Sequence, residues 1–326
     1  MSKPRVSDDE FIDTYRRLQS LKAVSDALGM QHQNVHARRK RIEKRYGVVL
    51  PQFDTRPAYN RSSYENHDPA LIHLKIDTGN VIVFSDAHYH PAYEPWTCHR
   101  ALVRFCKELK PKIVISNGDI FDFPSISRHH RIGWENRPTV QQELEYVQDR
   151  LEEVEKASIG AKFYRTWGNH DLRFDGILAN KMAELEGVKG TCLKDHIPRW
   201  NPCWALQINK YEAYISHRWK TSVHSPHNNT KDAGVSYGTG HDHFPRVDPW
   251  SDLRGLRFGF NSGTLADISE EDGSDISPFR YREQAPNHWW SSFITLSFVD
   301  GKMLEPQLVR KWNKDTVQYC GRLITV

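Results

Sequence analysis

VIVFSDAH, residues 81–88, decides the fold, because four apolar residues are followed at once by Ser, Asp, Ala and His. Short apolar runs of this kind are typical of strands buried in a parallel sheet. Further apolar segments end in polar residues in the same way: IVISNGDIFD (113–122), YRTWGNHD (164–171), YISH (214–217) and SYGTGHDH (236–243). Ligands of open α/β sheets bind beyond the carboxyl ends of the strands. We therefore expect all of these segments to meet at one site.

The spacing of the polar residues favours metal chemistry. Residues i and i+2 of an extended segment point the same way, so Asp86 and His88 are expected to reach one site, as are His241 and His243. Glycine precedes several of the polar groups, where we expect sharp turns. The chain has 17 histidines, many beside Asp or Asn. This abundance also favours metal or proton chemistry.

Helices are predicted between the apolar segments. TCHRALVRFCKEL (97–109) and TVQQELEYVQDRLEEVEKA (139–157) each place apolar residues on one face at helical spacing. LIHLKIDTGNVIVFSD (71–86) predicts a hairpin that leads into a buried strand, and a second hairpin is expected about Asp300-Gly301. The order of elements indicates an α/β layered domain with strand-rich edges.

The first 50 residues carry the positive charge of the chain. Their net charge is +5, whereas residues 51–326 sum to −1. Helices are predicted over residues 7–19, 21–28 and 31–46, the last two closed by Gly29 and Gly47. Helix, helix, glycine-containing turn and basic helix form the helix-turn-helix pattern. We expect a small all-α domain over 1–50, a linker over 51–72 and the main domain over 73–326.

LGMQHQNVHARRKRIEKRYGVVLP (28–51) resembles the helix-turn-helix of bacterial and phage DNA-binding proteins. The resemblance implies that polar side chains early in the last helix face bases, here Gln31, Gln33, Asn34 and His36. It implies that arginines reach phosphates, here Arg38, Arg39, Arg41 and Arg45. A small helical docking domain with a solvated basic face is the alternative.

The composition excludes several classes of protein. Hydrophobic residues make up 38% of the chain, which excludes disorder as its main state. No apolar run approaches the roughly 20 residues of a membrane span, and the N-terminus lacks the apolar stretch of a secretion signal. We expect a cytoplasmic protein. The five cysteines show no CxxC spacing, which argues against a disulfide framework or a zinc ribbon.

The ordered set D-x-H, GD-x-x-D, GNHD, lone His and GH-x-H resembles the signature of the calcineurin-like metallophosphoesterase superfamily over about residues 78–310. Asn261-Ser-Gly-Thr264 is similar to the family's small-residue loop. The resemblance implies a layered β-sandwich flanked by helices. It also implies ligands of one metal ion at Asp86, His88, Asp119 and His243, and of a second at Asp119, Asn169, His217 and His241, with Asp119 as the bridge.

These nitrogen and oxygen ligands suit divalent transition metals better than calcium. We expect two manganese ions, with iron, zinc, nickel or cobalt as alternatives. The lone histidine is open to question, because Arg218 follows His217 where the family usually has glycine, and His224 and His227 are nearby competitors.

The resemblance also implies a mechanism, in which a hydroxide held between the two ions attacks a phosphoester in line. His170 would protonate the leaving oxygen, with Asp171 fixing its tautomer. Asp122 would support a ligand histidine. A basic cluster is a candidate for substrate binding, with a solvated surface patch as the alternative; it consists of Arg128, His129 and His130.

The predicted helix-turn-helix makes DNA the expected partner and a phosphodiesterase of the nuclease type the leading function. One alternative is a nucleotide or phosphomonoester hydrolase, acting for example on phosphoproteins, with an accessory DNA- or protein-docking domain. A third hypothesis is a DNA-binding regulator whose phosphoesterase domain is only a scaffold.

Overall fold

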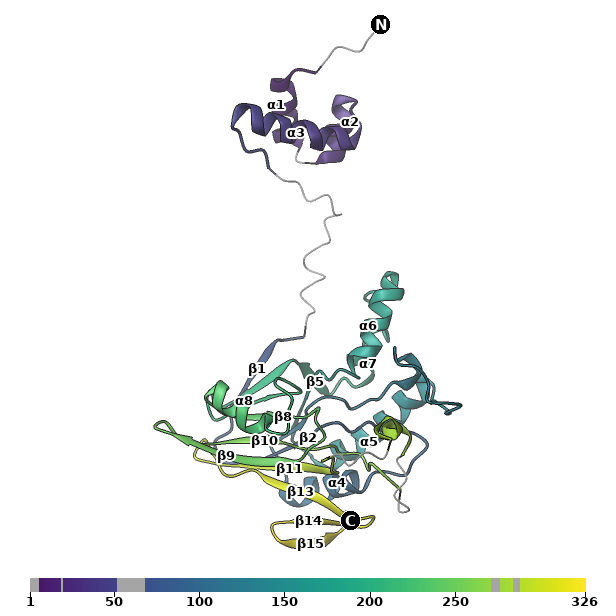
Figure 1. Cartoon of the computed structure of the whole chain (residues 1–326), viewed down its shortest axis with the longest axis vertical. Coiled ribbons are helices and arrows are strands. Elements are labelled where there is room, and N and C mark those ends of the chain that lie inside the picture. The colour runs from purple at the N-terminus through teal and green to yellow at the C-terminus, as the bar shows by residue number, and fades with distance from the viewer. Residues whose placement is uncertain (1–5, 19, 52–67, 271–275, 284–287) are drawn as a thin grey trace. The chain divides into compact units, whose positions relative to one another are not determined.

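The computed structural model describes residues 6–18, 20–51, 68–270, 276–283 and 288–326. Contacts divide the chain into two compact units, Met1–His67 and Asp68–Val326 (Figure 1). Residues 52–67, most of the expected linker, lie outside the described residues. No helix in the described part of the chain is long and apolar enough to cross a membrane.

The described part of the first unit is helical, with α1 at Asp8–Leu18, α2 at Leu21–Leu28 and α3 at His32–Tyr46. The Ser20 side chain caps α2 by accepting a hydrogen bond from Ala23 N, and Gly29 and Gly47 end α2 and α3 in the left-handed conformation. The helices share a small core formed by Phe11, Tyr15, Leu21, Val24, Val35, Ile42 and Leu50. The three predicted helices are confirmed to within one residue at each end.

In the described part of the second unit the strands form two sheets. The order in one sheet is β1 (Leu71–Leu74), β6 (Ala205–Ile208), β7 (Ala213–Ser216), β8 (Ser236–Thr239), β10 (Gly255–Asn261), β9 (Arg246–Asp252). The order in the other is β15 (Arg322–Thr325), β14 (Thr316–Tyr319), β13 (Gln307–Asn313), β11 (Ser292–Val299), β2 (Gly79–Phe84), β3 (Ile113–Ser116), β4 (Lys162–Thr166), β5 (Trp200–Cys203). Strand β12 (Lys302–Met303) pairs with β11.

Helices accompany both sheets. They are α4 (Thr97–Leu109), α5 (Val140–Ala157), α6 (Leu172–Lys181), α7 (Leu193–His196) and α8 (Ser225–Ala233), with 3₁₀ turns η2 (Pro124–Ile126), η3 (Ala183–Leu185) and η4 (Ser277–Arg282). Both long helices predicted from the sequence, α4 and α5, are confirmed. Helix α8 packs on β8, β9 and β10, while α4 packs on α5 and on β11, β13 and β14.

Strand β2 shows why its sequence is apolar without alternation. Val81 and Val83 face a core that both sheets share. Ile82 and Phe84 face the opposite way, into the core that includes α4 and α5. A strand covered on both faces has no polar side, which is typical of the centre of a layered α/β fold.

The predicted hairpin over residues 71–86 is wrong. Strand β1 pairs in parallel with β6 in one sheet, whereas β2 lies between β11 and β3 in the other. A turn signal between two apolar runs predicts that the chain changes direction there. It does not predict which strands pair, and here the pairing partners come from distant parts of the chain. The hairpin about Asp300-Gly301 is confirmed by the pairs Phe298–Met303 and Val299–Lys302.

The parallel strands bring the predicted site together. Strands β2, β3 and β4 are parallel neighbours, and β7 and β8 are parallel in the other sheet. Backbone hydrogen bonds join the polar segments after β2 and β3, from Asp86 N to Gly118 O, and those after β7 and β8, from Gly240 N to His217 O. The backbone N–H groups of His170, after β4, and of His241 donate to the carboxylates of Asp119 and Asp86. The site therefore lies where the carboxyl ends of strands from both sheets meet.

Candidate metal centre

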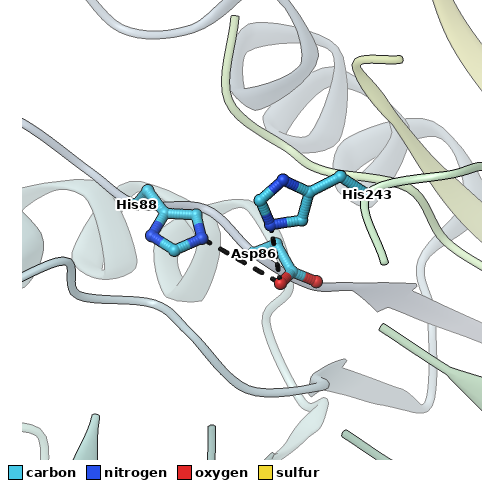
Figure 2. A group of neighbouring side chains, drawn as sticks. All are labelled: Asp86, His88 and His243. Carbon is cyan, nitrogen blue, oxygen red and sulfur yellow. Dashed lines mark hydrogen bonds and ion pairs between the residues drawn. The ribbon is translucent and has the colours of Figure 1, made fainter. Parts of the chain in front are cut away.

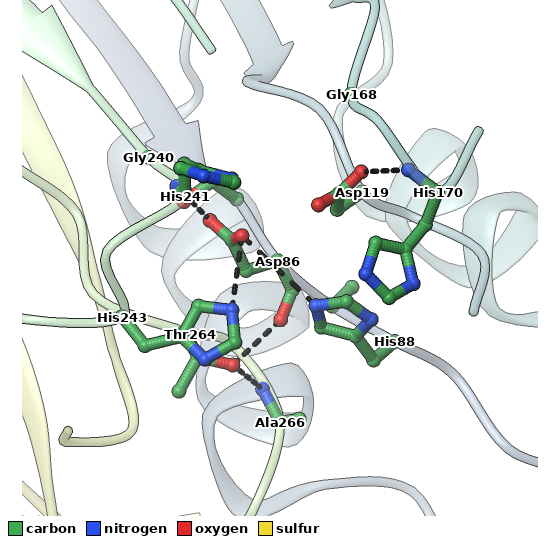
Figure 3. Close-up of polar contacts among 12 residues, drawn as sticks. Asp86, His88, Asp119, Gly168, His170, Gly240, His241, His243, Thr264 and Ala266 are labelled. Atoms are coloured by element: carbon green, nitrogen blue, oxygen red, sulfur yellow. Dashed lines mark hydrogen bonds and ion pairs between the residues drawn. The ribbon is translucent and has the colours of Figure 1, made fainter. Parts of the chain in front are cut away.

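Acidic and histidine side chains converge at these strand ends. Among the described residues, three groups have ligand atoms within 4.8 Å of one another: Asp86, His88 and His243; Asp119, His217 and His241; His88, Asp122 and His170. The first group is drawn in Figure 2, and Figure 3 shows how it lies next to Asp119 and His170. The first two groups contain every carboxylate and histidine that was predicted as a metal ligand.

Asp86 is the centre of the first group. Its Oδ1 lies 3.1 Å from His243 Nε2 and 4.0 Å from His88 Nε2, and all three side chains are buried (Figure 2). The other carboxylate oxygen, Oδ2, accepts a hydrogen bond from the backbone N–H of His241 at 2.9 Å. Thr264, in the small-residue loop, donates its hydroxyl to the carbonyl oxygen of Asp86 at 2.6 Å.

Asp119 is the centre of the second group. Its Oδ2 lies 3.2 Å from His217 Nε2, and its Oδ1 accepts the backbone N–H of His170 at 2.7 Å. His217 Nδ1 donates to the carbonyl oxygen of Asn117 at 2.8 Å, which leaves Nε2 as the nitrogen available to an ion. One carboxylate oxygen of Asp119 thus contacts His217, and the other contacts the backbone of His170.

His217, rather than its competitors, lies in the site. His224 is exposed at the start of α8, and His227 packs edge-on against Trp250 at 4.9 Å between ring centroids. Neither belongs to a group of candidate ligands among the described residues.

The predicted ligands include several buried polar atoms without a hydrogen-bond partner. Among the described residues these atoms are both ring nitrogens of His88, Asn169 Oδ1, His217 Nε2 and His243 Nδ1. Leaving buried polar groups unsatisfied costs free energy, so such a concentration calls for a bound species. Nitrogen and oxygen donors without a thiolate fit divalent transition-metal ions. The residues present therefore fit the metal ions that the resemblance implies.

The backbone at the ligands is not extended, which corrects the reason given for their spacing. The residues Asp86, His88, Asp119, His241 and His243 all have positive φ, between 39° and 69°. Non-glycine residues rarely adopt this conformation, and each instance costs on the order of 1–3 kcal/mol. The D-x-H and H-x-H side chains therefore reach the site from loops that are held in strained turns.

The glycines act mainly through close approach, which corrects the expectation of sharp turns. Of the three glycines that precede ligands, only Gly118 has a positive φ, of 82°. A Cβ on Gly168 would lie 2.1 Å from Asp119 Oδ1, and one on Gly240 would lie 2.7 Å from Asp86 Oδ2. Each of these two glycines therefore leaves space for a carboxylate from another loop.

His170 is oriented by Asp122. Its Nδ1 lies 2.8 Å from Asp122 Oδ1, and the same oxygen lies 3.4 Å from Nδ1 of His88. Burial opposes protonation of His170, but the carboxylates of Asp119 and Asp122 outweigh it and raise the pKa of His170 above its ordinary value. The imidazolium that a general acid requires is therefore favoured.

The expected contact between Asp171 and His170 is not formed. The buried carboxylate of Asp171 instead accepts backbone N–H groups of Asp119, Ile120 and Phe121, at 2.9, 3.0 and 3.2 Å. Adjacent residues at the start of a helix point in different directions, so sequence neighbours need not touch. Asp171 fixes the loop that carries Asp119, and Asp122 takes the role that was predicted for Asp171.

Two further residues of the site were missed from the sequence. Arg173, on α6, places its Nη2 3.2 Å from Nε2 of His170. Its position three residues after His170, in the first turn of α6, is a signal that was available. Glu143, on α5, accepts the backbone N–H groups of Asp122 and Phe123 at 2.6 and 2.7 Å. No sequence pattern connects α5 to that loop.

The basic cluster is only partly at the site. His129 and His130 line a cavity of about 560 Å³ whose wall also includes Asn169 and His170. Arg128 is exposed and does not belong to that wall, so its position agrees with the alternative of a solvated surface patch.

The predicted DNA-contacting residues on α3 fall into two sets. The exposed ones are Gln31, Gln33, Asn34, His36, Arg41 and Arg45. Arg38, by contrast, pairs with Asp8 at 3.0 Å and donates to the carbonyl oxygen of Val6, and Arg39 is buried 3.6 Å from Glu43. Both share the face of α3 that carries Val35 and Ile42, so they stabilise the unit. Neither is free to reach a phosphate.

A buried set of carboxylate, imidazole and amide groups beside a carboxylate-oriented histidine fits a metal-dependent phosphoester hydrolase. In agreement, the chain belongs to the calcineurin-like phosphoesterase family, whose model matches residues 79–302.

The comparisons with individual proteins found only distant similarity. No curated protein sequence matches the chain significantly. Among solved structures it is similar to a Vps29 single mutant from Entamoeba histolytica (13% identity, TM-score 0.38, 76% of this chain and 99% of that chain). Others are a putative diadenosine tetraphosphatase (14%, 0.36, 75% and 99%) and Vps29 from Chaetomium thermophilum (8%, 0.38, 76% and 97%).

Proposed function

We propose that this phosphoesterase hydrolyses phosphodiester bonds of DNA with two divalent metal ions, and that these ions are manganese. The observation that carries the choice of DNA is the basic N-terminal unit on the same chain. Its third helix exposes polar side chains at its start and the cations Lys40, Arg41 and Lys44 farther along. These exposed side chains support the proposal, because the last helix of a helix-turn-helix uses such groups to contact the major groove and the backbone.

The candidate ligands form two sets, one for each metal ion. Asp86, His88 and His243 would hold one ion, Asn169, His217 and His241 would hold the other, and Asp119 would be a ligand of both. When bound, such ions acidify water and neutralise charge on phosphoryl oxygens.

His170 would donate a proton to the leaving oxygen. Asp122 holds its Nδ1 at 2.8 Å, so Nε2 is the nitrogen that faces away from this carboxylate. Arg173 Nη2 lies 3.2 Å from Nε2 and adds positive charge on that side. General acid catalysis of this kind contributes about 10²–10⁴-fold in rate.

A hydrolysis panel tests the choice of substrate. The manganese-loaded full-length protein is incubated with labelled single- and double-stranded DNA, RNA, bis(p-nitrophenyl) phosphate and p-nitrophenyl phosphate. We expect cleavage of DNA and of the chromogenic diester. Hydrolysis of the monoester without any diester would overturn the proposal in favour of the nucleotide or phosphomonoester hydrolase.

A second experiment tests whether α3 docks on DNA. Arg41→Glu is compared with Arg17→Glu, which makes the same charge change at an exposed position of α1. Duplex affinity is measured over a range of salt concentrations. Loss of a phosphate contact should lower the salt slope by about one for Arg41→Glu only. Equal effects of the two variants would exclude α3 as the docking surface.

A further inference from the structure

The cavity beside the metal centre has the size of a small-ligand pocket. It encloses about 560 Å³, and its wall includes Asn169 and His170. Pockets that hold one small molecule span about 300–1,000 Å³. A base within a duplex has to leave its stack before it enters a pocket of this kind. The cavity therefore suits a single nucleotide but not a stacked base pair.

Tyr281 supplies an aromatic surface in this wall. Its side chain is 52% exposed although it lies in the cavity, so it is not simply a core residue. It packs against Trp289, with 5.8 Å between ring centroids, and Trp289 packs against the candidate ligand His243 at 4.5 Å. This row of rings fixes Tyr281 relative to the metal centre. A half-exposed ring held in this way is suited to stack on a nucleobase.

Arg173 supplies a positive charge in the same wall. Its side chain is 19% exposed, its Nη2 lies 3.2 Å from His170 Nε2, and its Nη1 donates to the carbonyl oxygen of Asp122. The nearest oxygen of the Asp122 carboxylate is 3.9 Å from Nη1, so this ion pair is a loose one. A guanidinium in this position matches phosphate oxygens well.

Arg137, the other arginine of the wall, is more closely paired with a carboxylate than Arg173 is. Arg137 pairs closely with Glu135 and donates to the carbonyl oxygen of Pro124 at 2.7 Å. Its charge is thereby neutralised at short range. Ile132 and Pro278 complete the cavity with apolar surface. The wall thus combines one loosely paired cation next to His170 with apolar and aromatic surface farther out.

We propose that this cavity binds one unstacked nucleotide of the substrate, with its base on Tyr281 and a phosphate oxygen on Arg173. The inference rests on the proposed function, since it takes the bond cleaved at the metal centre to be a nucleic-acid phosphodiester. It narrows the substrate class to DNA with an unpaired nucleotide, such as a single strand or a frayed end.

Binding of small ligands to the manganese-loaded full-length protein tests this proposal by calorimetry. The ligands are the 3′- and 5′-monophosphates of deoxyadenosine and, without a base, 2-deoxyribose 5-phosphate. Stacking of a base on an aromatic side chain is worth about 1–3 kcal/mol. At 1.4 kcal/mol per tenfold, the better nucleotide should bind about 5- to 150-fold more tightly than the base-free sugar phosphate.

Matched variants test which residues cause the preference for the nucleotide over the base-free sugar phosphate. Tyr281→Phe should keep the preference for the base, and Tyr281→Ala should reduce it to nearly none. Tyr211→Ala, at a tyrosine that is 66% exposed outside this wall, serves as the control and should keep it. Arg173→Gln should weaken nucleotide and sugar phosphate alike, by about tenfold or more. No base preference in the wild type, or an unchanged preference in Tyr281→Ala, would overturn the proposal.

Hydrolysis separates this inference from the proposed function. If the wild type cleaves unpaired DNA but shows no base preference in binding, the cavity assignment is wrong and the function stands. If it prefers the base but cleaves no diester, the cavity assignment stands and the proposed function is wrong.

Discussion

Asp122 Oδ1 lies 2.8 Å from Nδ1 of His170, and 3.4 Å from Nδ1 of His88. One carboxylate therefore orients both the proposed general acid and a predicted metal ligand. Glu143 holds the backbone of Asp122 in place from α5. The same carboxylate, that of Asp122, thus contacts both the proposed proton donor and a candidate metal ligand.

Asp122→Asn should weaken the general acid, because the negative charge of Asp122 helps to raise the pKa of His170. Without that charge the imidazolium loses its proton at lower pH. The alkaline limb of the pH–rate profile should therefore move to lower pH, with hydrolysis of DNA slowed by about 10- to 100-fold. Profiles of kcat/KM against pH provide the measurement. An unchanged alkaline limb would mean that Asp122 does not act through His170.

His170→Asn should separate chemistry from metal binding. His170 lies beside the two candidate ion sites, while its neighbour Asn169 has the unpartnered oxygen Oδ1. The variant should keep its metal and slow the hydrolysis of DNA by about 10²–10⁴-fold. The loss should be much smaller for p-nitrophenyl esters, whose leaving group needs little protonation. Loss of metal on elemental analysis would instead make His170 a ligand.

Gly168→Ala should remove metal binding, because its Cβ would lie 2.1 Å from Asp119 Oδ1 and 2.2 Å from Asp119 N. Asp119 would have to move together with its backbone. Gly176→Ala is the matched control, since nothing lies within 4 Å of a Cβ there, and in α6 alanine is favoured by about 1 kcal/mol. Metal content and thermal unfolding of both variants provide the measurement. Full metal content in Gly168→Ala would contradict the close approach.

Metal binding should release a proton from His217. Burial opposes its protonation, but the carboxylates of Asp119 and Asp86 outweigh this and raise the pKa of His217 to about 10. The metal-free protein therefore carries this proton at pH 7, and an ion has to displace it. Metal affinity should accordingly rise with pH up to about 10. Titration calorimetry in two buffers of different ionisation enthalpy should show about one more proton released by the wild type than by His217→Gln.

The sequence predicted the ligand loops and their order along the chain, because each apolar strand is followed directly by its polar residues. It also predicted α4 and α5, since their apolar residues keep helical spacing. It did not predict that β1 and β2 belong to different sheets. Strand pairing depends on contacts between distant segments, and local patterns do not contain this information.

The residues that hold the ligands and His170 in place were less predictable from the sequence than the ligands themselves. Whether Asp122 or Asp171 contacts His170 depends on how the turn before α6 directs each side chain. The left-handed backbone of Asp86 and Asp119 is likewise imposed by the surrounding loops and has no residue signature of its own. Arg38 shows the same limit in the first unit, because its basic side chain is used within the fold.

The number of metal ions per chain tests the central claim most directly. The protein is saturated with manganese, freed of unbound metal and analysed for metal and protein together with Asp119→Ala. The carboxylate of Asp119 lies 3.2 Å from His217, and in the proposed centre it would be a ligand of both ions, so both ion sites would depend on it. We predict two ions in the wild type and almost none in the variant. A wild type that retains no manganese, or a variant that retains both ions, would contradict a dinuclear centre bridged by Asp119.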